Sequence, residues 1–181
     1  MKKLLPIVCL VLMLLPLSLV VAQDKSQPAP DRAKIIAAAR ELIAAGTYCA
    51  LITVDETGRP QVRTMNPFPP EEDMTVYMAT STRSRKVQEI RRDPRVCLYY
   101  ADHTKATGYV AISGRAVLID DMKEIQKRKR AYWDQSFDPG LKNLVLIKVV
   151  PERLDVLNYK QGVVADTVTW RTPSIEMGNQ K

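Results

Sequence analysis

Histidine is almost missing from this sequence of 181 residues, and its scarcity excludes several kinds of site. His103 is the only one, and the carboxylates show no metal-ligand spacing, so the sequence argues against a zinc or similar metal centre. A Ser-His-Asp triad would have to use His103, and no Gly-x-Ser-x-Gly motif is present. The chain also lacks a Gly-x-Gly-x-x-Gly motif, which argues against a Rossmann-type nucleotide site.

Charged residues are few in the first 22 residues, which differ from the rest of the chain. Lys2 and Lys3 precede an uncharged apolar stretch from Leu4 to Val21, and the segment ends in Val-Val-Ala before Gln23. This pattern is typical of a secretory signal peptide. We expect residues 1–22 to be removed and the protein to be exported, periplasmic or extracellular. The alternative is an uncleaved signal segment, through which alone the protein would contact a membrane.

Cysteine is scarce as well, and two of the three cysteines lie outside this leader. Cys49 and Cys97 each lie in a strand-like apolar run. Two buried thiols are one interpretation. An oxidising compartment would permit a disulfide between them, and the sequence leaves both possibilities open.

Basic residues outnumber acidic ones, but not in a way that indicates nucleic acid. Without the leader the chain has 159 residues, 25 basic and 20 acidic, because the leader holds two of the 27 basic residues. One domain is expected at this length. The run at 127–130 could bind nucleic acid, or it could be the solvated face of a helix whose other face carries Ile125 and Trp133. Export favours the second interpretation.

Apolar periodicity predicts a mainly β, α+β domain over residues 31–160, between a linker at 23–30 and a tail at 161–181. Helices are expected from Asp31 to Gly46, from the 84–86 segment to Asp93-Pro94, and from Asp120 or Asp121 to about Trp133. The expected strands are 48–54, 61–65, 74–79, 96–101, 107–119 and 144–157, the last with a bend at Pro151. Six antiparallel strands indicate a barrel, which removes exposed sheet edges.

The most informative segment is Thr80-Ser81-Thr82-Arg83-Ser84-Arg85-Lys86, between a predicted strand and a predicted helix. Hydroxyls, three cationic side chains and free backbone N–H groups at a helix N-terminus all favour an anion such as phosphate. Alternatively, Ser81 or Ser84 simply caps a solvated helix. Upstream, residues 58–65 form a turn and a strand that carries Arg63, on the face opposite Val62.

Together with Asp93-Pro94-Arg95 and the run from Tyr109 to Ala116, these pieces resemble the pyridoxine 5′-phosphate oxidase-like family of FMN-binding split β-barrels, including its general stress protein branch. The resemblance covers roughly Asp31 to Tyr159. It implies a six-stranded antiparallel split barrel with flanking helices. It also implies a homodimer in which each FMN lies between the two subunits.

The resemblance also implies a set of cofactor-binding residues. In the oxidases the second-strand arginine and a Ser-Arg-Lys segment bind the FMN phosphate, while neighbouring groups support the phosphate or contact the isoalloxazine edge. Tyr109 takes the place of a glutamine that the oxidases contribute to the cofactor site. The implied residues are Arg63, Thr64, Met65, Thr80, Ser81, Ser84, Arg85, Lys86 and Tyr109.

The chain also departs from the oxidases. It lacks their C-terminal Arg-x-His, because no histidine follows His103, so conversion of pyridoxal compounds is not expected. Trp170-Arg171 is either a remnant of C-terminal flavin contacts or ordinary surface packing. The sequence favours an exported FMN-dependent oxidoreductase acting on an unidentified small molecule, with unidentified catalytic residues. The alternatives are a flavin or haem carrier or sensor without catalysis, and a dimeric barrel that has lost its ligand. The sequence does not separate FMN from a deazaflavin as the cofactor.

Overall fold

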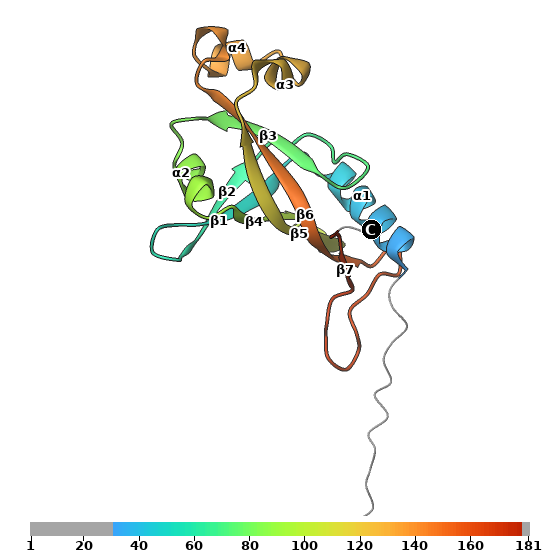
Figure 1. The fold of residues 1–181 in the computed structure, drawn as a ribbon. Helices are drawn as coiled ribbons and strands as arrows, with labels where there is room; N and C mark the ends of the chain where they lie inside the picture. The colour runs from blue at the N-terminus through green and yellow to red at the C-terminus, as the bar shows by residue number, and fades with distance from the viewer. Residues whose placement is uncertain (1–30, 179–181) are drawn as a thin grey trace, which may run out of the picture.

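Helix α1 (Arg32–Ala45) opens the part of the chain that the computed structural model describes, residues 31–178 (Figure 1). The Asp31 carboxylate accepts hydrogen bonds from the backbone N–H groups of Ala33 and Lys34, at 3.0 and 3.3 Å, and Gly46 ends the helix. Both predicted ends are therefore confirmed. The predicted signal peptide (1–22) and the predicted linker (23–30) both lie outside the described residues.

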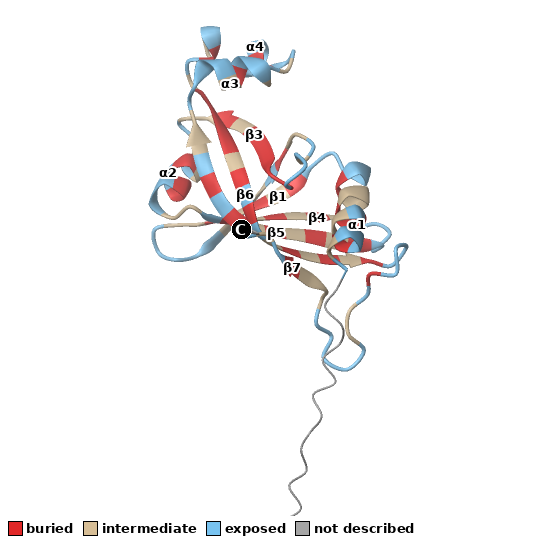
Figure 2. Ribbon diagram, turned by 45° about the vertical axis from the view of Figure 1, so that its right-hand side comes forward, coloured by how far each residue is buried: buried red, intermediate tan, exposed pale blue. Residues whose placement is uncertain are grey.

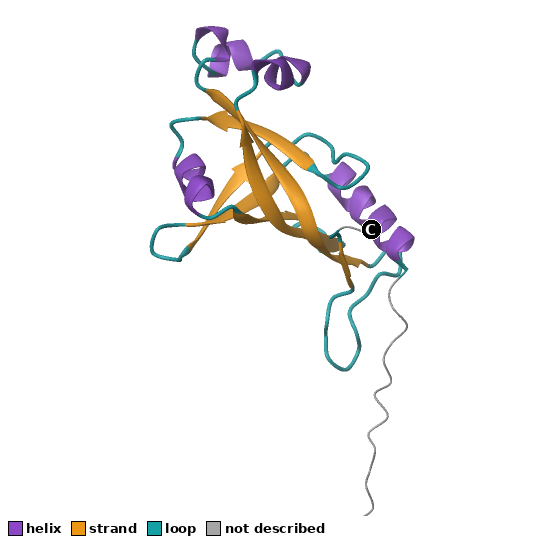
Figure 3. Cartoon of the chain, viewed as in Figure 1, coloured by secondary structure: helices purple, strands orange, loops and turns teal. Residues whose placement is uncertain are grey.

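Seven antiparallel strands form one sheet, in the hydrogen-bonded order β2-β1-β4-β5-β6-β3, with β7 added beside β6. Buried and less buried residues alternate along most strands, and the helices lie around the sheet (Figures 2 and 3). The strands are β1 (Cys49–Val54), β2 (Pro60–Met65), β3 (Val76–Ser81), β4 (Arg95–Ala101), β5 (Gly108–Ile119), β6 (Leu144–Asn158) and β7 (Ser174–Glu176). The predicted mainly β, α+β class is confirmed, and β7 is a short strand that the sequence did not indicate.

The barrel is split between β2 and β3, the two ends of the strand order. Within the described residues β2 and β3 do not pair along their length. In this part of the chain, the only backbone contacts between them involve the segment that directly follows β2. Pro67 forms an isolated bridge with Met78, and the backbone N–H of Phe68 donates to the carbonyl of Tyr77 at 2.7 Å. The opening of the split therefore lies between β2 and the end of β3, where the chain turns into α2 (Arg85–Arg92).

Strands β5 and β6 are the longest pair and carry the bend that was predicted at Pro151. Their register shifts between Ser113 and Gly114, where Gly114 pairs with Pro151. A Cβ atom at Gly114 would lie 2.1 Å from the carbonyl oxygen of Val150. Only glycine allows the two backbones to approach this closely.

The prediction of one helix from residue 120 or 121 to about residue 133 is wrong in its length. The chain instead forms two short helices, α3 (Met122–Lys127) and α4 (Trp133–Ser136), followed by the 3₁₀ turn η1 (Pro139–Leu141). They project at one end of the sheet (Figure 1) over a second small core, in which Ile125 and Trp133 are buried.

The basic run at 127–130 covers the last residue of α3 and the turn that leads to α4, and the protein itself engages most of its charges. Arg128 stacks on the ring of Tyr77 at 3.7 Å and pairs with Glu71 and Glu124, each at 2.7 Å. Lys129 pairs with Asp134. Through Arg128, the run therefore connects the α3–α4 segment to the sheet.

Cys49 and Cys97 are free thiols, and the strand register explains why they do not meet. Cys97 of β4 pairs with Ile52 of β1, so these two side chains lie on the same face of the sheet. Cys49 is three residues before Ile52 in β1, and side chains alternate along a strand, so the Cys49 side chain points to the opposite face. Of the two possibilities that the sequence left open, the structure shows separate thiols. Within residues 31–178, moreover, helices of the length and apolar character needed to span a membrane are not found.

Candidate functional site

The predicted phosphate segment forms the turn from β3 into α2. Ser84 occupies the N-cap position, but its side chain makes no capping hydrogen bond to the helix. Its hydroxyl instead accepts from Thr80 Oγ1 at 3.3 Å, and Thr80 in turn accepts from Lys86 Nζ at 3.1 Å. The Ser84 side chain therefore does not cap the helix, as the alternative interpretation required. Instead, Thr80, Ser84 and Lys86 form one polar cluster.

Arg63 reaches the same helix from β2. It lies on the strand face opposite Val62, as predicted, and its side chain is only 17% exposed. The Arg63 guanidinium donates to Thr53 Oγ1 and to Glu89 Oε2, the latter at 2.7 Å. Thr53 Oγ1 also donates to Glu89 Oε2, which closes a buried triangle between β1, β2 and α2.

Arg85 lies at the rim of this cluster, with a side chain that is 75% exposed. It pairs with Glu89 at 3.2 Å and donates to Gln61 Oε1 at 3.2 Å. Gln61 Nε2 donates to Asp55 Oδ2 at 2.8 Å, so a chain of polar contacts joins the turn after β1 to α2. The side chain of Arg85 is thus oriented but still reachable from solvent.

Arg63 and Arg85 both contact the carboxylate of Glu89, while Lys86 bonds to Thr80 instead. With three cations and one carboxylate, the cluster has an excess of two positive charges. Burial raises the pKa of Glu89, but hydrogen bonds from Thr53 and Arg63 outweigh that effect and hold it below its usual value. Burial lowers the pKa of Lys86, and the neighbouring positive charge of Arg63 lowers it further. Among the described residues Lys86 has no carboxylate in ion-pair contact. The cluster thus favours an additional anion.

The structure places the remaining predicted residues in three different ways. Ser81 Oγ accepts from the backbone N–H of Arg83 at 3.2 Å, so it orders the turn. Met65 is buried, whereas Thr64 is exposed on the outer face of β2. Thr64 and Met65 continue the strand that carries Arg63, so they stay beside the cluster.

Tyr109 lies away from the cluster within one chain. It pairs with Ala101 at the end of β4 farther from α2, six residues or roughly 20 Å beyond Arg95. Its hydroxyl shares a hydrogen bond of 2.6 Å with Thr172, and its ring lies beside Tyr99, with the centroids 5.5 Å apart. A single chain therefore does not bring Tyr109 to Arg63 and Lys86.

Sequence reasoning missed Thr53, Gln61 and Glu89, which orient the predicted cations. Glu89 had a usable signal, because it stands four residues after Arg85 on the same helical face. Thr53 and Gln61 had none, since only the register that pairs Thr53 with Gln61 in β1 and β2 brings them together. Within residues 31–178 the structure also shows no group of three potential metal ligands.

Comparison with known proteins identifies the family. Residues 35–158 match the pyridoxamine 5′-phosphate oxidase family. The chain is also 30% identical over 115 residues to general stress protein 26 of Bacillus subtilis, covering 60% of this chain and 78% of that protein. This chain therefore belongs to the pyridoxamine 5′-phosphate oxidase family, as the sequence motifs indicated.

Solved structures share the fold. A Clostridium acetobutylicum protein related to general stress protein 26 has a TM-score of 0.64 at 15% identity, covering 81% of this chain and 96% of that one. An FMN-binding protein from Nostoc punctiforme, related to pyridoxamine 5′-phosphate oxidase, has a TM-score of 0.53 at 21% identity, covering 74% and 86%. An F420 reductase (TM-score 0.51) and a haem-binding protein from Mycobacterium smegmatis (TM-score 0.59) also have this fold, at 20% and 14% identity.

Proposed function

We propose that this protein is an exported FMN-binding oxidoreductase that holds the FMN phosphate with Arg63, Arg85 and Lys86. The supporting observation is the excess of two positive charges at the N-terminus of α2, where half-buried Lys86 has no acidic partner within residues 31–178. A phosphate would supply the missing negative charge, and the N-terminal end of the helix would contribute its partial positive charge. FMN binding by the Nostoc punctiforme protein of the same fold adds support.

Each residue has a distinct part in this proposal. Lys86 and Arg85 supply the charge that Glu89 does not neutralise. Arg63 is held in place by Thr53 and Glu89, so it is oriented before any ligand arrives. The Thr80 and Ser84 hydroxyls, already linked to Lys86, supply further hydrogen bonds.

FMN, when bound, supplies hydride transfer to or from a small molecule, and the protein residues bind and orient it. This division of labour accounts for a cluster that holds cations and hydroxyls but no histidine. A non-catalytic flavin carrier would need the same cluster. Flavin binding alone therefore does not distinguish an enzyme from a carrier, and a test of flavin reduction is needed.

The absorbance spectrum of the purified protein, recorded before and after addition of FMN and gel filtration, tests the proposal. Retained flavin absorbance at one FMN per chain is the expected result, and complete loss of the flavin on the column would contradict it. Anaerobic addition of NADPH or NADH to the loaded protein should then bleach the flavin. An unchanged spectrum with both donors would favour the carrier.

We also propose that the mature protein begins after residue 22 and forms a homodimer. The composition of the leader and the family membership support these two proposals. Mass spectrometry of exported protein should give a chain that begins at Gln23, and an intact chain starting at Met1 would contradict cleavage. Sedimentation at micromolar concentration should give twice the chain mass, and a monomer that binds FMN fully would contradict a shared site.

A further inference from the structure

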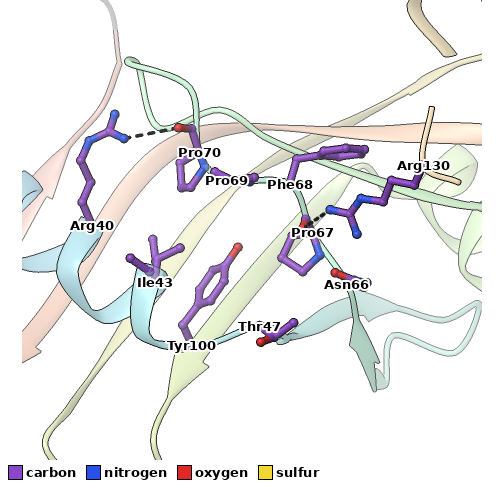
Figure 4. Close-up of a pocket in the computed structure, with 12 residues that line it drawn as sticks. Arg40, Ile43, Thr47, Asn66, Pro67, Phe68, Pro69, Pro70, Tyr100 and Arg130 are labelled. Atoms are coloured by element: carbon purple, nitrogen blue, oxygen red, sulfur yellow. Dashed lines mark hydrogen bonds between the residues drawn. The ribbon is translucent and has the colours of Figure 1, made fainter. Parts of the chain in front are cut away.

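A cavity separate from the cationic cluster lies between the C-terminal half of α1 and the loop that follows β2 (Figure 4). Its volume is about 500 Å³, within the range of small-molecule sites. Ile43 and the prolines of the 66–70 loop form much of its wall, together with the ring of Phe68. None of Arg63, Arg85 and Lys86 lines it.

Tyr100 of β4 extends its hydroxyl into this cavity (Figure 4). The residue is only 2% exposed, and among the described residues its hydroxyl oxygen has no hydrogen-bond partner. The nearby Cys49 thiol adds to the effect of burial in raising the pKa of Tyr100, but its geometry is not that of a hydrogen bond. A buried hydroxyl without a partner is unfavourable, so this group is available to a ligand acceptor.

Two guanidinium groups also line the cavity, from different parts of the chain. Arg40 of α1 donates to the carbonyl oxygens of Pro70, Glu71 and Glu72, at 3.3, 2.6 and 3.1 Å. Arg130 donates to the carbonyl oxygen of Pro67 at 2.7 Å and lies 4.1 Å above the Phe68 ring. Within residues 31–178 neither arginine has a carboxylate in ion-pair contact.

The charge of the cavity is therefore one-sided. None of its lining residues is acidic, so the two guanidinium charges are not neutralised there. The carbonyl contacts fix both side chains in place while leaving each a full positive charge. Apolar walls, fixed cations and a free hydroxyl donor together suit a molecule with an apolar body and an anionic acceptor group.

We propose that this cavity is a second ligand site, which binds a small organic acid with a compact apolar or aromatic body. The apolar body would pack on Ile43 and the proline wall, and the acid group would accept hydrogen bonds from Tyr100 and from a guanidinium. This proposal does not rest on FMN binding, because the cavity and the cationic cluster share no residue.

Fluorescence titration with two matched probes tests the proposal on the purified protein. The probes are 8-anilinonaphthalene-1-sulfonate, which carries an acid group, and N-phenyl-1-naphthylamine, which has the same aromatic body without it. We expect the sulfonate to bind at one molecule per chain and at least tenfold more tightly than the neutral probe. Equal affinities would contradict a site that recognises the anion.

Variants of Arg130 assign the binding to this cavity. Arg130→Gln should weaken sulfonate binding about tenfold and leave the neutral probe unaffected, whereas Arg130→Lys, which keeps the charge, should recover most of the affinity. Arg115→Gln is the matched control, because Arg115 is an exposed arginine on β5 outside the cavity. An equal loss in Arg130→Gln and Arg115→Gln would show a non-specific charge effect and overturn the proposal.

Tyr100→Phe separates a ligand role from a structural role. Because the hydroxyl has no hydrogen-bond partner in the described part of the chain, the variant should melt at the same temperature as the unaltered protein or higher, while binding the sulfonate several-fold more weakly. A lower melting temperature with unchanged probe affinity would show that the hydroxyl serves the fold.

Competition with flavin tests whether the cavity is a separate site. Equilibrium dialysis of the sulfonate should give the same bound fraction with and without saturating FMN. Stoichiometric displacement would assign the cavity to the flavin and overturn the proposal. If the protein bound no FMN but kept the sulfonate, the function proposed above would fail and this site would stand.

Discussion

Glu89 determines how the cationic cluster works, although the sequence drew attention to the arginines and the lysine around it. The carboxylate is buried, with a side chain only 3% exposed, and it contacts both Arg63 and Arg85. It therefore orients the cations and also competes with any incoming anion for them. The ion pairs of Glu89 stabilise the fold, whereas its competition with the ligand lowers the affinity for an anion.

Replacing this carboxylate should reveal both effects. Glu89→Gln removes the charge that pairs with Arg63, so we expect a loss of about 1.5–3 kcal/mol in the free energy of unfolding. Affinity for FMN should rise, because three positive charges would then face the phosphate without a competitor. Urea unfolding and FMN titration measure the two quantities.

Glu56→Gln is the control for this prediction, because Glu56 is a 76% exposed carboxylate that pairs with Arg92 at the far end of α2. It should change either quantity little, since exposed ion pairs contribute about 0–1 kcal/mol. A Glu89→Gln protein that binds FMN more weakly than the unaltered protein would show that orientation outweighs competition.

Cys49 should be chemically protected in the folded protein. Burial raises the pKa of the Cys49 thiol from an ordinary value of 9.0 to about 11. The folded state thus favours the neutral thiol, and this contribution to stability is complete below pH 9 and is lost as the pH rises through about 11. Iodoacetamide at pH 8 should modify Cys49 only after urea denaturation, as measured by peptide mass spectrometry. Equal rates in folded and denatured protein would be inconsistent with this environment.

At the scale of elements, the sequence predicted most strands within one or two residues of their observed bounds. Alternating apolar residues and turn motifs carry that information locally, as in β1, β2 and β5. Two features escaped because they depend on distant contacts. The helix after Asp121 ends early where Arg128 turns to pair with Glu71 and stack on Tyr77, and three-residue β7 exists only by pairing with β6.

The candidate site shows the same division. The sequence marked Arg63 and the segment from Thr80 to Lys86, since charge and hydroxyl content are visible in any chain. It could not show that Tyr109 lies beyond the reach of this cluster in one subunit, because that distance follows from the pairing of β4 with β5. Nor could it show that Thr53 and Glu89 hold Arg63.

The bend between β5 and β6 requires glycine at position 114. Gly114→Ala should lower the free energy of unfolding by about 1–3 kcal/mol, because the new Cβ atom would lie 2.1 Å from the Val150 carbonyl oxygen. Gly46→Ala is the matched control, since its nearest neighbour would be 3.8 Å away and its change should stay within about 0.5 kcal/mol. Chemical denaturation gives both values. Equal effects of the two substitutions would show that the bend tolerates a side chain.

For the molecule as a whole, the split barrel brings residues from separate segments to one end of α2. Arg63 and Lys86 are 23 positions apart in the chain, yet the positive charge of Arg63 contributes to lowering the pKa of Lys86. A solvated surface charge would not feel its neighbour in this way, because water screens it. We infer that these converging charges recognise a phosphate.

The most direct test compares FMN with riboflavin, which has the same ring system but no phosphate, in titrations of the unaltered protein, Lys86→Ala and Arg91→Ala. Loss of a charged hydrogen bond of about 1.5–3 kcal/mol predicts roughly 10- to 150-fold weaker FMN binding by Lys86→Ala. Riboflavin affinity should stay the same in all three proteins, and Arg91→Ala, which alters an exposed arginine on the same helix, should bind FMN normally. Unchanged FMN affinity in Lys86→Ala, or an equal loss for riboflavin, would contradict a phosphate site at α2.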